Sequence, residues 1–220
     1  MSVLTPNPPP ASVTAFLSGL PAFLSGGLPD TVVSETYVGS APRIPSAAEV
    51  GIGSGPPGPG HPKIPVVLQA FVLSLQDAAN NTGVISATPA GWRFFAGSAP
   101  DGTVLGTVIQ RRQTWKLVAV HYGHLVVETL NASLQLNSLL PEQFQTQEYE
   151  LRLLAIPGLN MEVFWLAAQN GESADLILPV PGTLAPSRPT ATAPLQMPTF
   201  LAEIRPLAAS LLTMRAGYGA

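Results

Sequence analysis

Prolines and glycines gather in two stretches of this 220-residue chain, and they restrict the fold more than any other feature. The first stretch, Met1 to Pro62, contains PNPPP and GIGSGPPGPGHP, and the second, from Pro181, contains PGTLAPSRPTATAP. Proline lacks the backbone donor that helix interiors and central strands need, and glycine weakens both. We therefore predict an extended N-terminal arm (1–62), a folded body (63–181), and a proline-rich linker followed by a C-terminal helix (182–220).

The body is predicted to have an α+β fold, in which a helix packs on a mostly antiparallel sheet and the Pro/Gly-rich extended arms flank it. Apolar residues recur at helical spacing from about Pro65 to Asn80, which predicts the helix. The segments WRFFAG, VLGTVIQR and TWKLVAVH predict strands. YELRLLAI, NMEVFWLAA and ADLILPV, separated by turn-forming residues, predict a three-stranded antiparallel meander. The stretch 122–140 suits either strand or helix, and we favour a helix for its early part.

The composition is poor in charge. Charged residues make up 10% of the chain, against about 25% in typical soluble domains. A surface that other subunits cover explains this depletion. The alternative is a monomer with a neutral polar surface, and the composition alone does not separate the two.

The two arms carry apolar residues that can anchor them. The N-terminal arm nearly repeats itself within AFLSGLPAFLSGGLP, and the C-terminal segment has apolar residues at helical spacing, with Thr199 as the expected N-cap and Pro206 as the expected kink or limit. Such arms either fold back on their own body or reach neighbouring copies, and we favour the second. The predicted interface residues are Phe16, Leu17, Leu20, Phe23, Leu24, Leu28, Phe200, Leu201 and Ile204.

Several classes of partner and location are not expected. The ten basic residues are scattered, with only Arg111 and Arg112 adjacent, whereas nucleic-acid binding needs clustered cations. The longest apolar run, Ile64 to Leu75, is shorter than the ~20 residues of a membrane-spanning helix. No secretory signal is recognised, so we expect no membrane span and, by default, a cytoplasmic protein. The excess of arginine over lysine suits a GC-rich bacterial genome.

The candidate chemistry is sparse. His121, His124 and Glu128 are a weak candidate for a metal site, because they share one face only if the whole stretch is helical. Glu148 and Glu150 share a strand face and can form an acid–base pair, although two solvated carboxylates explain them as well. No serine lies in a nucleophile elbow. No cofactor is expected.

These features favour a non-enzymatic structural subunit whose arms contact neighbouring copies in a filament, lattice or shell. A homo-oligomer is therefore the expected partner state. The first alternative is a module that binds a small molecule or peptide near Trp92, Trp115 and Trp165. The second is a metal-dependent hydrolase that uses the two histidines and Glu128.

Overall fold

The computed structural model describes residues 2–24, 32–33, 64–80, 85–97, 103–141, 144, 147–170, 173–180 and 194–217. The predicted α+β class is confirmed, since helices pack on strands that are mostly antiparallel. The chain divides into two compact units. Unit 1 comprises Met1–Pro6, Ala70–Ala90 and Gln135–Ala220, and unit 2 comprises Asn7–Gln69 and Gly91–Leu134.

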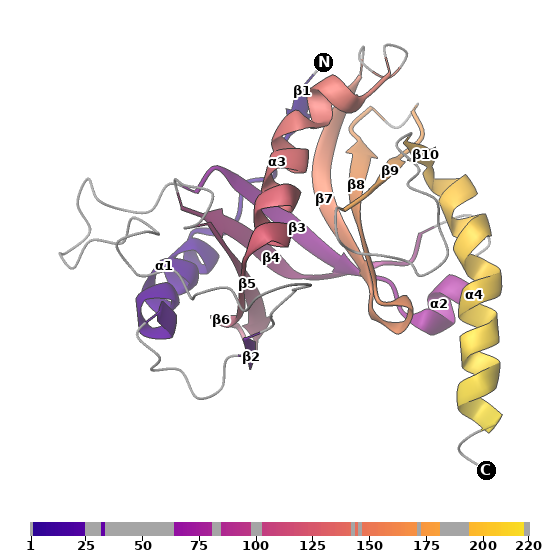
Figure 1. Cartoon of the computed structure of the whole chain (residues 1–220), viewed down its shortest axis with the longest axis horizontal. Helices are drawn as coiled ribbons and strands as arrows, with labels where there is room; N and C mark the ends of the chain where they lie inside the picture. The colour runs from indigo at the N-terminus through magenta and orange to yellow at the C-terminus, as the bar shows by residue number, and fades with distance from the viewer. Residues whose placement is uncertain are drawn as a thin grey trace. The chain divides into compact units, whose positions relative to one another are not determined.

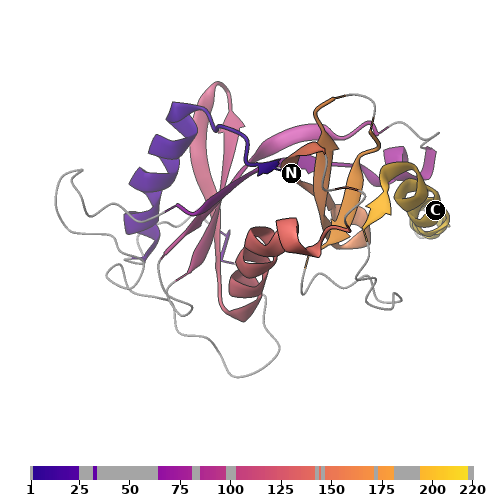
Figure 2. The same cartoon turned by 90° about the horizontal axis from the view of Figure 1, so that it is seen from above.

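Unit 2 is built around an antiparallel sheet. β4 (Thr88–Ala96), β5 (Val104–Arg111) and β6 (Thr114–Tyr122) pair in that order. β2 (Val32–Val33) adds in parallel to β6, and β3 (Val66–Val72) lies next to β4. Helix α1 (Pro10–Leu24) lies along one face of β5 and β6 (Figure 2). The predicted strands WRFFAG, VLGTVIQR and TWKLVAVH are thus confirmed.

The core of unit 2 forms where α1 meets this sheet. Phe16 is fully buried, and its ring stacks on that of Phe94 with a centroid distance of 5.0 Å. Gly106 on β5 leaves the space for this contact, because a Cβ there would lie 2.3 Å from the Phe16 ring. Apolar side chains of β4, β5 and β6 complete the core: Trp92, Ala96, Val104, Val108, Val120 and Tyr122.

Unit 1 contains the predicted meander, which is confirmed. β7 (Glu148–Ile156), β8 (Met161–Ala168) and β9 (Leu176–Pro179) pair antiparallel in sequence order, and the 3₁₀ turn η3 (Pro157–Leu159) joins the first two. β10 (Leu195–Gln196) pairs antiparallel with β9, while β1 (Ser2–Leu4) pairs in parallel with β7.

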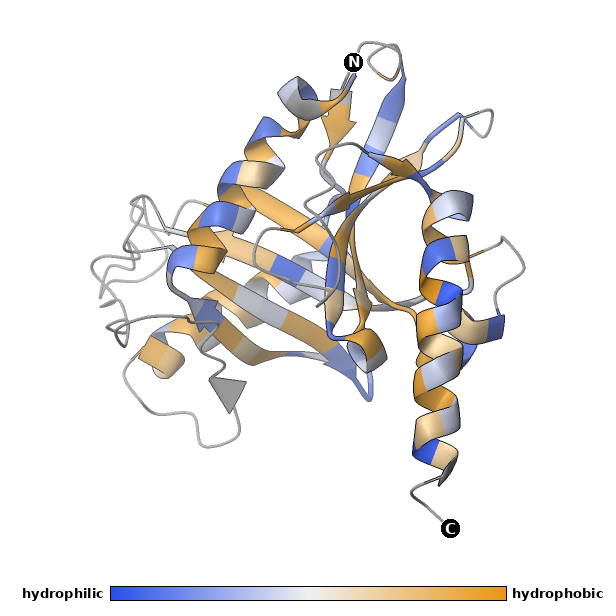
Figure 3. Ribbon diagram, turned by 45° about the vertical axis from the view of Figure 1, so that its right-hand side comes forward, coloured by the Kyte–Doolittle hydropathy of each residue, from blue (hydrophilic) through white to orange (hydrophobic). Residues whose placement is uncertain are grey.

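Two helices complete unit 1. α2 (Leu75–Asn80) packs against α4 (Met197–Gly217), and the two lie side by side in Figure 1. Both contribute to a core with one face of the meander, and orange apolar segments of α4 can be followed in Figure 3. The buried residues that α4 supplies are Met197, Phe200, Leu201, Ile204 and Ala208.

The helix predicted from Pro65 to Asn80 is wrong over its first half. Residues Val66 to Val72 form β3, and only Leu75 to Asn80 are helical. Valines at 66, 67 and 72 favour a strand because their branched Cβ fits a pleated sheet. Ser74 then starts α2, since its Oγ accepts a hydrogen bond from the Asp77 backbone N–H at 3.0 Å, which is an N-cap interaction.

The N-terminal arm is not extended at residues 10–24, where α1 forms. Its buried residues Phe16, Leu20 and Phe23 are spaced i, i+4 and i+7, so they share one helical face. Pro10 occupies the first position of α1, where a missing N–H costs nothing. Pro21 is exposed near the end of the helix, so the hydrogen bond that it cannot donate to the Leu17 carbonyl lies close to the terminus.

The helix favoured for the early part of 122–140 is confirmed and continues to the end of the stretch, as α3 (His124–Leu139). It begins after Gly123, whose φ is +101°. The C-terminal helix is also confirmed, but its start differs from the prediction. α4 begins at Met197, so Thr199 is not its N-cap. The Met197 N–H instead donates to the Asp175 carbonyl at 2.8 Å. Among the described residues, no helix is both long and apolar enough to cross a membrane.

Candidate functional site

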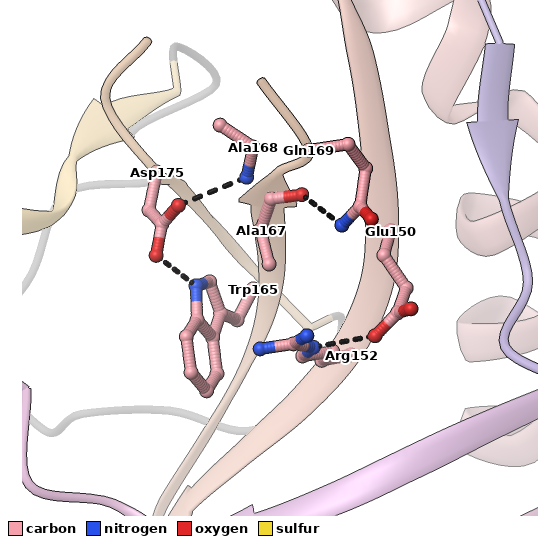
Figure 4. Close-up of polar contacts among 7 residues, drawn as sticks. All are labelled: Glu150, Arg152, Trp165, Ala167, Ala168, Gln169 and Asp175. Carbon is pink, nitrogen blue, oxygen red and sulfur yellow. Dashed lines mark hydrogen bonds and ion pairs between the residues drawn. The ribbon is translucent and has the colours of Figure 1, made fainter. Parts of the chain in front are cut away.

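A group of polar contacts in unit 1 surrounds Asp175 (Figure 4). Asp175 directly precedes β9, and Trp165 lies within β8. The Trp165 Nε1–H donates to Asp175 Oδ2 at 2.8 Å, and the Ala168 N–H donates to Oδ1 at 2.9 Å. Both carboxylate oxygens therefore accept a hydrogen bond, which compensates for partial loss of water around the charge. Burial raises the pKa of Tyr149, and the negative charge of Asp175 raises it further.

An ion pair lies beside this carboxylate. Arg152 and Trp165 are cross-strand partners on β7 and β8. The Arg152 Nε–H donates to Glu150 Oε1 at 2.7 Å, and its guanidinium lies 4.8 Å from the Trp165 ring and 5.1 Å from the Phe71 ring. The side chains of Arg152 and Glu150 are 24% and 23% exposed, so the cation–π contacts form in a partly desolvated setting, where they are stronger.

This cluster is suited to stabilise the fold. The cation–π contact of Arg152 with Trp165 links β7 to β8, and the two hydrogen bonds to Asp175 link β8 to the start of β9. The rings of Trp165 and Phe71 belong to the unit 1 core, and they meet edge to face at a centroid distance of 5.0 Å. The charged groups thus close one side of that core. Within the cluster, no nucleophile is paired with a base in the way that covalent catalysis requires.

A second polar group lies on the sheet of unit 2. Arg93 on β4 donates from Nη1 to Thr107 Oγ1 of β5 at 2.6 Å, and the same nitrogen lies 3.4 Å from His121 Nε2 on β6. All three residues are half-buried. Arg93 therefore ties three adjacent strands together on the face opposite Phe94.

The structure does not assemble the candidate metal site. His121 lies on β6 and interacts with Arg93, whereas His124 begins α3 and pairs with Glu128 at 2.8 Å. His124 Nε2 and Glu128 Oε1 form an exposed i, i+4 pair. In the described part of the chain, no three residues of ligating type are grouped closely enough to hold a metal ion.

The predicted arm residues lie mostly inside their own chain. Phe16, Leu20 and Phe23 are at most 7% exposed in the unit 2 core, and Leu17 and Leu24 pack against it half-buried. Phe200, Leu201 and Ile204 are at most 1% exposed in the unit 1 core. Leu28 lies outside the described residues. The interface role of these residues stays a prediction, and it requires the helices that carry them to leave these positions.

The tryptophans of the predicted ligand site belong to two different cores. Trp92 is buried and Trp115 half-buried in unit 2, while Trp165 is buried in unit 1. The ligand-binding alternative stays a prediction. Glu148 and Glu150 do not act as an isolated pair, because Glu150 is bonded to Arg152.

Comparison with protein-family models, with curated proteins and with solved structures found no match.

The sequence contained one usable signal for the Asp175 cluster. A tryptophan inside the apolar run MEVFWLAA must bury its indole N–H, and a buried donor requires an acceptor. Asp175 is the acidic residue that opens the next strand. The position of Arg152 above Trp165 depends on the register of β7 and β8, which the spacing of apolar residues does not specify.

Proposed function

We propose that this chain is a non-enzymatic structural subunit that associates with copies of itself, and that the outer side of α4 is a contact surface. The charge-poor composition is one argument. The observation that carries the proposal is the C-terminal half of α4, where the large apolar side chains of Leu207 and Met214 are exposed on one side of the helix.

Residues 207–216 of α4, LAASLLTMRA, contain a single charged residue. Leu211 and Leu212 pack partly against the unit 1 core, and Ala208 is buried in it. Leu207 and Met214 are 45% and 55% exposed. These two side chains are seven residues apart and therefore share one side of the helix, and large apolar side chains exposed together often mark an interaction site. A partner that covers Leu207 and Met214 would remove this exposed apolar surface from water.

The buried arm residues are compatible with such assembly in one further way. α1 and α4 fill apolar sites of their own chain, and each is joined to the rest by a proline-rich sequence. A neighbouring copy can donate the same helix to the same site, since exchange of identical elements preserves the contacts. Whether the copies then form a closed ring or an open filament or lattice depends on whether the repeated contact closes on itself.

The test is sedimentation velocity of the full-length protein over a range of concentrations. We expect species well above the 22.9 kDa of one chain. The double variant Leu207→Gln/Met214→Gln should remain monomeric at concentrations where the wild type assembles. Leu134→Gln is the matched control, because Leu134 is 56% exposed on α3, and it should assemble normally. A wild type that stays monomeric throughout would overturn the proposal.

A further inference from the structure

The turn between β5 and β6 has an unusual backbone for its residues. Arg112 and Gln113 connect the strands, and their φ angles are +47° and +68°. Arg111 and Thr114 pair directly before and after them. Two-residue hairpins that need positive φ at both positions favour asparagine and glycine, because a Cβ is strained there. The turn geometry therefore does not account for Arg112 and Gln113, and backbone strain of this kind is often found at functional sites.

The end of this hairpin is a two-stranded ribbon. In the described part of the chain, the pairs that join β4 to β5 end at Val108, and those that join β2 to β6 lie at Ala119 and Val120. Between these limits the described strands pair only with each other, residues 109–111 with residues 114–116. A two-stranded β-ribbon is narrow enough to enter the major groove of B-DNA, which is about 12 Å wide.

The ribbon carries exposed cations. Arg111 and Lys116 lie on the same face, because Lys116 pairs with Ile109, two residues before Arg111. The opposite face holds Trp115, which packs half-buried against the unit 2 core. Arg112 lies at the turn itself. All three cations are exposed, and among the described residues their side chains have no partner in a hydrogen bond or an ion pair.

The surroundings of the ribbon hold little negative charge. Residues 85–97 and 103–127 contain no acidic residue, and α1 has no charged residue. Glu128 is the one carboxylate among the described residues of unit 2, and it is paired with His124. Three of the ten basic residues of the chain, by contrast, lie between 111 and 116. Charges of one sign gathered on one part of a surface attract a partner of the opposite sign.

We propose that the end of the β5–β6 hairpin binds double-stranded DNA, with its cations on the phosphates and its turn in the major groove. The scattered cations of the sequence do not predict such a partner, but the ribbon brings three of them together. Phosphate contacts come mostly from arginine, lysine, glutamine and threonine side chains, which are the residue types at 110–114 and 116. Arg112 and Gln113 have the side chains that bind the edges of guanine and adenine through two hydrogen bonds. This inference does not depend on the proposed function.

Two other polyanions fit the ribbon less well. A membrane surface would be bound by apolar side chains as well as by charge, and none of the described residues 109–116 is both apolar and exposed. A single strand of nucleic acid is held largely by bases that stack on aromatic side chains, whereas Trp115 packs against the unit 2 core. The exposed arginine, lysine and glutamine side chains match the phosphates and base edges of a duplex.

The test is fluorescence anisotropy of a short labelled DNA duplex at several salt concentrations. Three phosphate contacts give a slope of about −2.7 for the logarithm of the association constant against the logarithm of the salt concentration. The association constant should therefore fall roughly fortyfold between about 0.05 M and about 0.2 M salt. The titration is repeated with Leu207→Gln/Met214→Gln, which keeps duplex binding apart from self-association.

Two variants of the ribbon and one control locate the contact. Arg111→Gln/Lys116→Gln should reduce the salt slope to about −0.9, because one cation remains. Arg205→Gln/Arg215→Gln on α4 changes the net charge equally and should leave the slope unchanged. Arg112→Asn/Gln113→Gly should weaken duplex binding roughly fivefold or more. Its thermal unfolding midpoint should rise, since these residues suit the turn, so the weaker binding is not a loss of fold.

Several outcomes would overturn the inference. One is the absence of duplex binding at the lowest salt concentration, and another is wild-type binding by both ribbon variants. Tighter binding to vesicles of anionic lipid, or to a single strand of the same sequence, would show that the ribbon serves a different polyanion. A wild type that stays monomeric but binds the duplex through the ribbon would overturn the proposed function and support this inference.

Discussion

Individual residues show how closely α1 fits its sheet. The Phe16 ring occupies the space that Gly106 leaves open on β5, and a Cβ at Gly19 of α1 would lie 2.9 Å from Leu117 Cβ on β6. Small residues on both surfaces thus let the helix approach the strands. The sequence showed Gly106 within VLGTVIQR, but a glycine in a strand predicts a close approach without naming the partner.

Replacing Gly106 by alanine tests this contact. We expect Gly106→Ala to lower the free energy of unfolding by about 1–3 kcal/mol, because the added methyl group overpacks the buried Phe16 ring. Urea denaturation followed by tryptophan fluorescence measures the change. In the Gly106→Ala background, Phe16→Leu should cost less than it does alone, since the smaller side chain relieves the overlap. Strictly additive effects would show that the two residues are not in direct contact.

At the scale of elements, prolines misled the prediction most. α1 contains Pro21 and α4 contains Pro206, although an interior proline usually breaks or kinks a helix. Pro206 is exposed, as is Ala202, four residues earlier, whose carbonyl loses its helical partner. Water can satisfy a carbonyl on that side. The remaining cost of the proline is offset by packing in the unit 1 core, which involves Phe200, Leu201 and Ile204 before the proline and Ala208 after it.

The cost of Pro206 should be measurable. An interior proline is about 3 kcal/mol less favourable than alanine in a helix, and its stiffness in the unfolded chain returns less than about 1 kcal/mol. We expect Pro206→Ala to raise the free energy of unfolding by roughly 1–2 kcal/mol in a urea titration. Pro10→Ala, at the first position of α1, is the control and should change stability little. A neutral or destabilising Pro206→Ala would mean that the kink itself is needed for packing.

How much the sequence predicted depends on how local the determining interactions are. The meander β7–β9 was predictable, because alternating apolar residues and turn sequences specify it within a short stretch. β3 was not predictable, because helical spacing is also met by Val67, Leu68, Phe71 and Val72. Pairing with neighbouring strands makes this segment a strand. The Ser74–Asp77 cap was readable in the sequence and would have corrected that boundary. The Arg152–Trp165 contact depends on strand register, which is a long-range property.

For the whole molecule, the position of α1 changes what a truncation means. An arm that only connects copies can be removed without harm to the body. α1 instead covers Phe94, Val104 and Val108 of unit 2, and residues 32–33 pair with β6. Removal of residues 1–62 therefore uncovers a core and removes an edge strand. Exposed apolar surface of that kind promotes nonspecific association.

We accordingly expect the chain that begins at residue 63 to form larger and more heterogeneous species than the full-length protein, and to bind a hydrophobic dye strongly. Light scattering and dye fluorescence measure both effects. A synthetic peptide of residues 7–24 should reduce dye binding by refilling the site, whereas the same peptide with Phe16→Ser should not. A truncated chain that is monomeric, folded and free of dye would show that α1 is dispensable to the core. Rescue by the peptide would show that the site accepts α1 from a separate molecule, which is the condition that any exchange of this helix between copies must meet.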